Sequence, residues 1–227
     1  MQKMIAWQHG LILALMLLMS GVSAQEQNWA LEKQDDDNRI RVYTRINPDS
    51  PLKEFRGVMQ VQSRLTALVA LIEDHHRAPD WIHQCRAIDI IERHSHEEIL
   101  FYMVTAAPWP VKDRDSVVHS LLQQDPDTYT VRIDMQVRND IFPASDDMIR
   151  ISNMQGFWQF RPLAEGWVEV TYQVHADPGG GIPGWLINSL VVDTPYYTLR
   201  NMQKLVQESR YQQASLPHVR NRPDHSL

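Results

Sequence analysis

The last third of the chain contains a long apolar segment that follows three consecutive glycines and begins at a proline. The glycines at 179–181 end any strand before them, because glycine has no Cβ and adds little to a pleated sheet. Pro183 suits the first turn of a helix, where its missing N–H would have had no partner. We therefore predict a helix over 183–212. Its first turns are apolar on nearly every side, so it needs two apolar surroundings.

The residues before this helix alternate between apolar and polar side chains in many short stretches. A period of two is the pattern of a strand with one buried face. One stretch, 65–76, has apolar residues at helical spacing instead and predicts an amphipathic helix. Short links between consecutive strands favour antiparallel pairing. The predicted strands cover 29–32, 40–45, 54–62, 87–93, 99–106, 116–123, 129–138, 149–161 and 167–175.

These elements predict an α+β fold, in which one strongly curved antiparallel sheet wraps around the long C-terminal helix. A sheet of so many strands twists and curls. If the helix does not fill the concave face, an internal hydrophobic cavity remains, and such cavities hold ligands. The length of 227 residues suits one sizeable domain.

The first 24 residues have the layout of a secretory signal peptide. A lysine at position 3 precedes an unbroken apolar run over 11–19, and Val22 and Ala24 form a small-residue cleavage site. The run is too short to span a bilayer, which takes about 20 apolar residues. We therefore predict a signal peptide over 1–24, a domain over 25–212 and a flexible, polar tail over 213–227. The mature protein is expected in a bacterial periplasm.

The charge and the cysteine content exclude several classes. The formal net charge of −6 argues against nucleic-acid binding, since no basic patch is present to neutralise phosphates. Cys85 is the only cysteine, so no intrachain disulfide forms, and we predict a half-buried structural thiol. The ten histidines lack the spacing of a compact zinc motif. We expect a monomer with no metal and no cofactor.

Three ordered motifs resemble the START domain, the lipid-transfer module of the helix-grip superfamily. Residues 107–115 resemble the family's Pro–x–x–Arg–Asp approach to a central strand. Residues 158–162 and 168–176 resemble its last hairpin. Residues 177–188 resemble the opening of its lid helix, and 194–199 look like the continuation in bacterial members. The resemblance covers residues 29–212.

The resemblance implies a tunnel between sheet and helix that binds one lipid or similar hydrophobic molecule and shields or shuttles it, without catalysis. It also implies transient contact with a membrane. Some sterol-binding members carry a buried acid–arginine pair in the tunnel, and those positions correspond to Phe101 and Ser120 here. Neither residue is charged, so the sequence does not identify the ligand.

Candidate ligand-binding residues follow from this picture, with ordinary core packing as the alternative for each. Arg114 would contact a head group, or else form a structural ion pair with Asp115 or hydrogen bonds that stabilise a turn. The cavity candidates are Trp81, Phe101, Met103, Trp109, Arg114, Ser120, Phe157, Trp158, Leu186, Leu190, Thr194 and Tyr197. The candidate hinges of the lid helix are Gly179, Gly180, Gly181 and Pro195.

Two other functions stay open at the level of sequence. A helix-grip cyclase or hydrolase acting on a polyketide-like or aromatic substrate would need ionisable groups in the cavity, for which His119, Asp134 and His175 are candidates. An interaction module would instead use the second apolar face of the helix to bind a membrane or a partner. That face would consist of Trp185, Val192, Tyr196 and Leu199.

Overall fold

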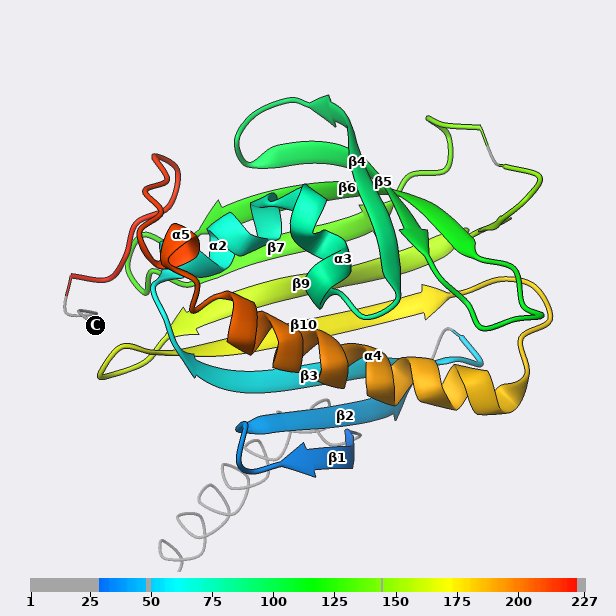
Figure 1. Ribbon diagram of the computed structural model, residues 1–227, viewed down its shortest axis with the longest axis horizontal. Helices are drawn as coiled ribbons and strands as arrows, with labels where there is room; N and C mark the ends of the chain where they lie inside the picture. The colour runs from blue at the N-terminus through cyan, green and yellow to red at the C-terminus, as the bar shows by residue number, and fades with distance from the viewer. Residues whose placement is uncertain (1–28, 48–49, 144, 224–227) are drawn as a thin grey trace, which may run out of the picture.

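The computed structural model describes residues 29–47, 50–143 and 145–223 (Figure 1). The predicted signal peptide, 1–24, lies outside the described residues. The strands are β1 Ala30–Asp35, β2 Ile40–Ile46, β3 Lys53–Gln62, β4 Cys85–Arg93, β5 Glu98–Thr105, β6 Arg114–Gln124, β7 Val131–Val137, β8 Ile149–Arg150, β9 Asn153–Pro162 and β10 Trp167–Asp177. The helices are α2 Leu65–Glu73, a 3₁₀ turn at His75–Arg77, α3 Ala78–Trp81, α4 Gly184–Leu205 and α5 Ser209–Gln212.

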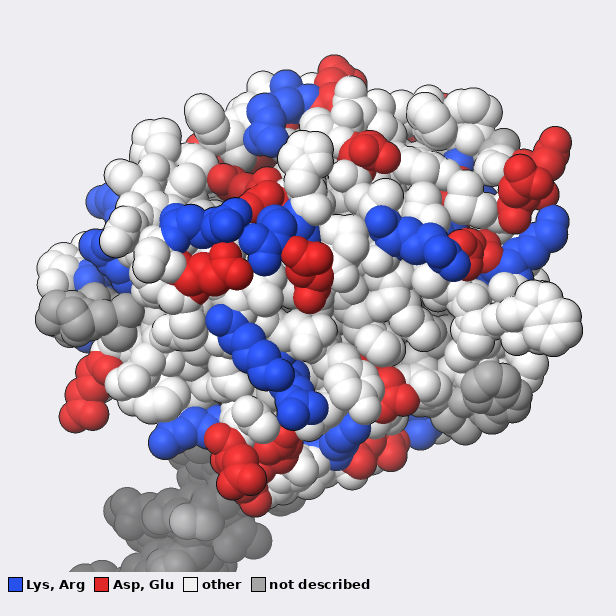
Figure 2. Space-filling model, in the orientation of Figure 1, with Lys and Arg blue, Asp and Glu red and all other residues white. Residues whose placement is uncertain are grey.

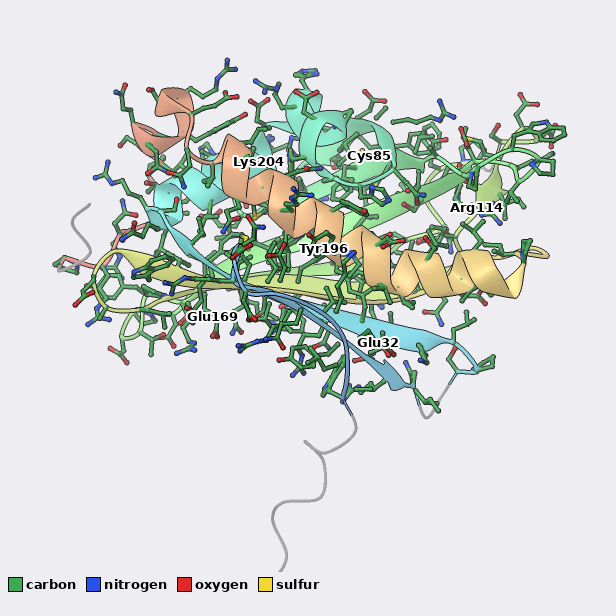
Figure 3. The ribbon with its side chains drawn as sticks, turned by 60° about the horizontal axis from the view of Figure 1, so that its bottom comes forward. Glu32, Cys85, Arg114, Glu169, Tyr196 and Lys204 are labelled. Carbon is green, nitrogen blue, oxygen red and sulfur yellow. The ribbon has the colours of Figure 1, made fainter. Side chains whose placement is uncertain are left out.

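The strands form one sheet in the order β1-β2-β3-β10-β9-β7-β6-β5-β4, and every pair along this path is antiparallel. The sheet curves around α4, while α2 and α3 lie on the same side (Figures 1 and 3). The predicted α+β architecture is therefore confirmed. One predicted strand, 149–161, is divided. The short β8 pairs with β6 in parallel, and the chain then turns at residues 151–152 to run antiparallel to β7.

The core lies between the concave face of the sheet and the three helices. Alternation along the strands sends one set of side chains inward, as in β3, where Met59 and Val61 are buried. Beneath α2 and the second half of α4, the packing is complete. Leu68, Phe160, Leu199 and Met202 are fully buried there.

α4 lies close to the sheet at a glycine of β3. A Cβ built on Gly57 would lie 2.7 Å from Leu199 Cδ1 and 3.1 Å from Pro195 Cβ. Pro195 is buried at this crossing, and α4 continues through it from Gly184 to Leu205. The predicted helix over 183–212 thus ends early, because Glu208 adopts an extended conformation before the separate α5.

The predicted second apolar face of α4 is wrong for two of its members. Leu199 is buried against Gly57 of β3, and Tyr196 is buried because the β1–β2 hairpin extends the sheet far enough to cover that flank of the helix. The Tyr196 hydroxyl donates a hydrogen bond to Asp35 in β1 at 2.7 Å, and Lys33 Nζ lies 3.8 Å from its ring (Figure 3). The side chain of Trp185 lies outside the described residues.

The predicted flexible tail is also wrong for residues 213–223, which pack against the domain. Val219 is buried in the main core cluster. Asn221 Oδ1 accepts a hydrogen bond from the Thr66 N–H at 3.1 Å, so the tail caps the first turn of α2. Arg64, the residue before that helix, provides no side-chain cap of its own. The polar sequence of the tail therefore supplies hydrogen bonds and does not indicate disorder.

Across the described ranges, no helix has the length and apolar character needed to cross a bilayer.

The first prediction concerns the contact between Gly57 and α4. Gly57→Ala should lower the free energy of unfolding by about 1–3 kcal/mol, because the new methyl group overpacks the crossing of β3 and α4. Gly181→Ala is the matched control, since nothing lies within 4 Å of a Cβ at that position. Urea denaturation of both variants measures the difference. Equal stabilities would show that the helix does not lie this close to the strand.

Candidate ligand-binding cavity

A cavity of about 170 Å³ lies between the concave face of the sheet and the first half of α4. Five α4 residues and three β10 residues provide much of its wall. The helix residues are Leu186, Ile187, Leu190, Val191 and Thr194, and those of β10 are Tyr172, Val174 and Ala176. Met103 of β5, Met154 of β9 and Ile151 in the turn before β9 add further apolar surface. The surroundings are thus mainly apolar, which suits a hydrophobic ligand.

The cavity exists because the packing loosens along α4. Leu199 and Met202 in the second half have no exposed surface, whereas Leu190 and Val191 in the first half are only partly buried. The sheet supports the second half directly at Gly57, and the first half continues past that contact toward the loop at 177–183. A single helix therefore closes the core at one end and covers a cavity at the other.

An aromatic stack forms the floor of the cavity. The ring of Tyr172 lies parallel to that of Trp158, with centroids 3.9 Å apart, and meets Phe55 edge-on at 5.1 Å. Tyr172 faces the cavity, whereas Trp158 lies behind it in the core. Burial raises the pKa of the Tyr172 phenol far above its usual value, so the hydroxyl remains protonated and uncharged.

Arg114 lies at the hinge end of the cavity, near the start of α4 (Figure 3). Its guanidinium donates to the carbonyl oxygens of Pro178 at 3.2 Å and Gly179 at 3.3 Å, and to that of Lys112. The alternative of turn-stabilising hydrogen bonds therefore describes its contacts. Burial lowers the pKa of Arg114, although an arginine still carries its charge at neutral pH.

Asp115 does not pair with Arg114 but with an arginine from β8. Arg150 donates two hydrogen bonds to the Asp115 carboxylate at 2.8 and 3.1 Å, and Tyr102 donates a third at 3.0 Å. Burial opposes ionisation of Asp115, but these donors outweigh it and lower the pKa of the carboxyl group. The buried pair ties the parallel strand β8 to β6.

Five of the predicted cavity residues line the cavity: Met103, Arg114, Leu186, Leu190 and Thr194. Whether they contact a ligand stays a prediction. Trp81, Phe101, Ser120 and Trp158 are buried outside the cavity. Trp81 and Trp158 pack against each other edge-on at 5.8 Å and fill the core beside α3, which leaves no room for a ligand there.

The three other predicted cavity residues lie on the surface or near it. Trp109 is 92% exposed in the loop between β5 and β6. Phe157 is adjacent to Trp158 in β9, so its side chain faces the opposite side of the sheet. There the guanidinium of Arg132 lies 3.7 Å from the centre of its ring. Tyr197 points outward from α4 and packs against the ring of His83 at 5.1 Å.

Half of the cavity residues that sequence reasoning missed come from loops. They include Leu52, Ile82, His83, Gln84, Pro108, Pro178 and Ile182. Loops carry no periodic pattern that shows which side chain turns inward. The cavity is thus built partly by segments that only the tertiary structure brings together.

The predicted hinge has the backbone geometry that its glycines allow. Gly179 and Gly180 have φ angles of 64° and 67°, in the left-handed region that glycine adopts readily. The Gly179 N–H donates to the Asp177 carboxylate at 2.9 Å. Gly181 has open space around it, and Pro195 is held against Gly57. Motion at these residues stays a prediction.

The three candidate catalytic groups lie on the wrong side of the sheet for chemistry in the cavity. His119, Asp134 and His175 line an open groove of about 570 Å³ on the convex face. Each alternates with an inward neighbour, so the register of β6, β7 and β10 places all three on the convex side, where His175 is nonetheless buried. His119 Nε2 lies 2.7 Å from the carboxylate of Glu98.

Two other expectations concern reactive or metal-binding groups. Cys85 is buried more deeply than predicted, and burial raises the pKa of its thiol to about 11. The thiol is therefore un-ionised at neutral pH and suits a structural role. In the part of the chain that the structure describes, no group of three or more His, Cys, Asp or Glu side chains is arranged to hold a metal ion.

Comparisons with known proteins agree with this geometry. A family model described as the START domain matches residues 12–212. An uncharacterized protein of Pseudomonas aeruginosa is 31% identical over 186 residues, which cover 82% of this chain and 90% of that protein.

Solved structures give the same result. A STAR-related lipid transfer protein from Xanthomonas axonopodis is 32% identical, with a TM-score of 0.72, over 80% of this chain and 99% of that one. Human StAR-related lipid transfer protein 5 shares the fold at 17% identity, with a TM-score of 0.71, over 89% of this chain and 97% of that one. The family match and the two bacterial relatives confirm the resemblance seen in the sequence motifs, and the chain belongs to the START domain family.

Proposed function

We propose that this protein binds one lipid or similar hydrophobic molecule in the cavity under α4, and shields and shuttles it through the periplasm without converting it. The observation that carries the proposal is the apolar cavity between α4 and the aromatic floor at Tyr172. The Xanthomonas relative, whose name describes lipid transfer, supports the same activity.

The free energy of burial is sufficient for such a role. Each methylene group removed from water contributes about 0.8 kcal/mol. A chain of about ten methylenes therefore contributes about 8 kcal/mol, which corresponds to a Kd of about 1 µM before the entropic cost of binding. An acyl chain needs no charged partner to bind at this level.

The present cavity is too small for a complete membrane lipid. Ligand pockets usually measure about 300–1,000 Å³, and a cavity of about 150 Å³ holds a molecule as small as benzene. The volume here is about 170 Å³. A larger ligand therefore requires the wall to move outward. The first half of α4 is mostly only partly buried and is joined to the sheet by the glycine loop, so we expect this part of the wall to move.

The position of the ionisable groups favours carriage over catalysis. His119, Asp134 and His175, on which a cyclase or hydrolase would depend, line the convex groove. His83 does line the cavity, but burial lowers its pKa and favours the neutral ring. The Tyr172 phenol is uncharged as well. The cavity wall thus offers an apolar ligand few groups for acid–base chemistry.

Exposed apolar side chains at the hinge end of the cavity suggest how a ligand is exchanged. Trp109, 92% exposed, follows the cavity residue Pro108, and Ile46, 73% exposed, ends β2 beside the strand that begins with the cavity residue Lys53. The loop before α4 lies at this same end (Figure 1). On the face that carries α4, charges of both signs are interspersed (Figure 2). We propose that the protein acts as a monomer and that this end contacts a membrane transiently through its apolar side chains.

The first test of this function identifies what the protein carries. Native mass spectrometry of protein purified from its own cells, followed by organic extraction, should show a stoichiometric hydrophobic adduct that dissociates on unfolding. An empty protein that also takes up no lipid from vesicles would contradict carriage. Fractionation of the same cells, with the N-terminal residue of the purified protein determined, tests export and cleavage after Ala24.

A second prediction places the ligand in the cavity. Ala176→Phe fills the space beneath α4 and should weaken ligand binding by about tenfold or more, because the ring occupies volume that the ligand needs. Thr171→Phe, on the opposite face of the same strand, is the matched control and should bind as the wild type does. Binding is measured by displacement of a fluorescent fatty acid. Equal binding by both variants would place the ligand elsewhere.

A third prediction concerns membrane contact. Trp109→Ser should slow lipid transfer between vesicles by about fivefold while the affinity for ligand stays unchanged, because the indole ring favours the bilayer interface. Leu31→Ser, which removes an exposed apolar side chain from the edge strand β1, is the control. If both variants transfer lipid at the wild-type rate, Trp109 does not take part in docking.

A further inference from the structure

Arg114 is a buried cation whose neighbouring carboxylates are already engaged. It is only 4% exposed. Asp113, before it, pairs with Arg86 at 2.6 Å, and Asp115, after it, pairs with Arg150 at 2.8 Å. Among the described residues, no carboxylate lies within ion-pair distance of Arg114 itself. The cavity therefore has a positive charge in its wall that the protein does not neutralise by direct pairing.

The partners of Arg114 satisfy its hydrogen bonds without cancelling its charge. Its three acceptors among the described residues are backbone carbonyls, and a guanidinium has five N–H donors in all. The bonds to Pro178 and Gly179, at 3.2 and 3.3 Å, are longer than the 2.7–2.9 Å typical of a charge-assisted bond to a carboxylate. An anionic oxygen would be a better partner than either carbonyl, because burial strengthens the attraction between unlike charges.

The second cation in the cavity wall is already neutralised. Lys53 Nζ lies 3.1 Å from the Glu32 carboxylate, and its side chain is 43% exposed. Arg114 differs in both respects. Phe101 and Ser120 occupy the positions that hold an acid–arginine pair in some family members. Both residues are uncharged here and lie buried outside the cavity, so neither can bind a charged head group. Selectivity for a charged head group would therefore depend on Arg114.

We propose that the cavity takes a single-chain amphiphile with an anionic head, a carboxylate or a phosphate, and that this head binds Arg114 at the hinge end. This inference rests on the proposed carriage of a hydrophobic ligand and names the class of that ligand. The head group replaces the carbonyls of Pro178 and Gly179 on the guanidinium. The glycine loop is thereby released, so binding of the correct head loosens the attachment of α4 to β6.

The test compares ligands that differ only at the head. Laurate, methyl laurate and dodecyl phosphate share one chain length, and their affinities for the full-length protein can be measured by calorimetry at pH 8. We expect laurate or dodecyl phosphate, or both, to bind at least tenfold more tightly than the ester. The stronger of the two identifies the head group. Inorganic phosphate alone, without a chain, should not compete.

Variants locate the charge responsible. Arg114→Gln should reduce the preference for the anion to less than twofold, whereas Arg114→Lys should keep part of it. Lys112→Gln removes a neighbouring, exposed cation whose ammonium group donates to the Asp146 carbonyl and, among the described residues, to no carboxylate, so it should leave the preference unchanged. Circular dichroism shows whether each variant is folded. If Arg114→Gln does not fold, hydrogen exchange of the wild-type protein still tests the proposal. The exchange rate of the backbone amides in residues 177–183 should increase more with laurate than with methyl laurate.

The outcomes separate this inference from the function on which it rests. Equal affinity for laurate, dodecyl phosphate and methyl laurate would overturn the anion site and leave carriage of a hydrophobic ligand intact. An anion preference that persists in folded Arg114→Gln would overturn the assignment to Arg114. Failure of all three ligands to bind would overturn both proposals.

Discussion

The contact between α4 and β3 fixes the position of the other parts of the molecule. Gly57 allows the helix to approach the strand so closely that Leu199 and Pro195 lie directly on its backbone. That contact anchors the second half of α4 against the concave face, and the curvature of the sheet then separates the first half from it. The cavity is the consequence, since the first half of α4 does not follow the curved sheet as closely as the second half does.

This arrangement divides the domain into two regions of different packing. Around α2 and the second half of α4, side chains such as Phe160 and Met202 are fully buried. Around the first half of α4, the wall includes loops and several partly buried residues, and the polar group Arg114 is held by backbone carbonyls. Local opening requires the least free energy where few apolar contacts are lost. Access to the cavity is therefore expected where the packing is weakest, without disturbance of the core.

The sequence predicted the fold well because alternation and helical spacing are local properties. The strands of the sheet and the long C-terminal helix follow from such patterns, and so do cavity residues on α4 such as Leu190. The failures concern contacts between distant segments. Tyr196 is buried by the β1–β2 hairpin, and Val219 is buried although it lies in a polar tail. The position of His119 depends on the register of β6, and the position of Trp109 depends on the conformation of the loop between β5 and β6. The sequence pattern predicts neither of these.

The order of the strands has a consequence for how the chain is made. β3 pairs with β10, so Glu54 and Gln173, which are bonded to each other, are separated by 119 residues. Closing so large a loop is slow, because its entropic cost must be met before the contact stabilises anything. The two halves of the sheet can join only after the last strand has been synthesised. A growing chain with this topology therefore cannot complete its sheet, or the cavity that the sheet and α4 enclose, until nearly all of its sequence is available.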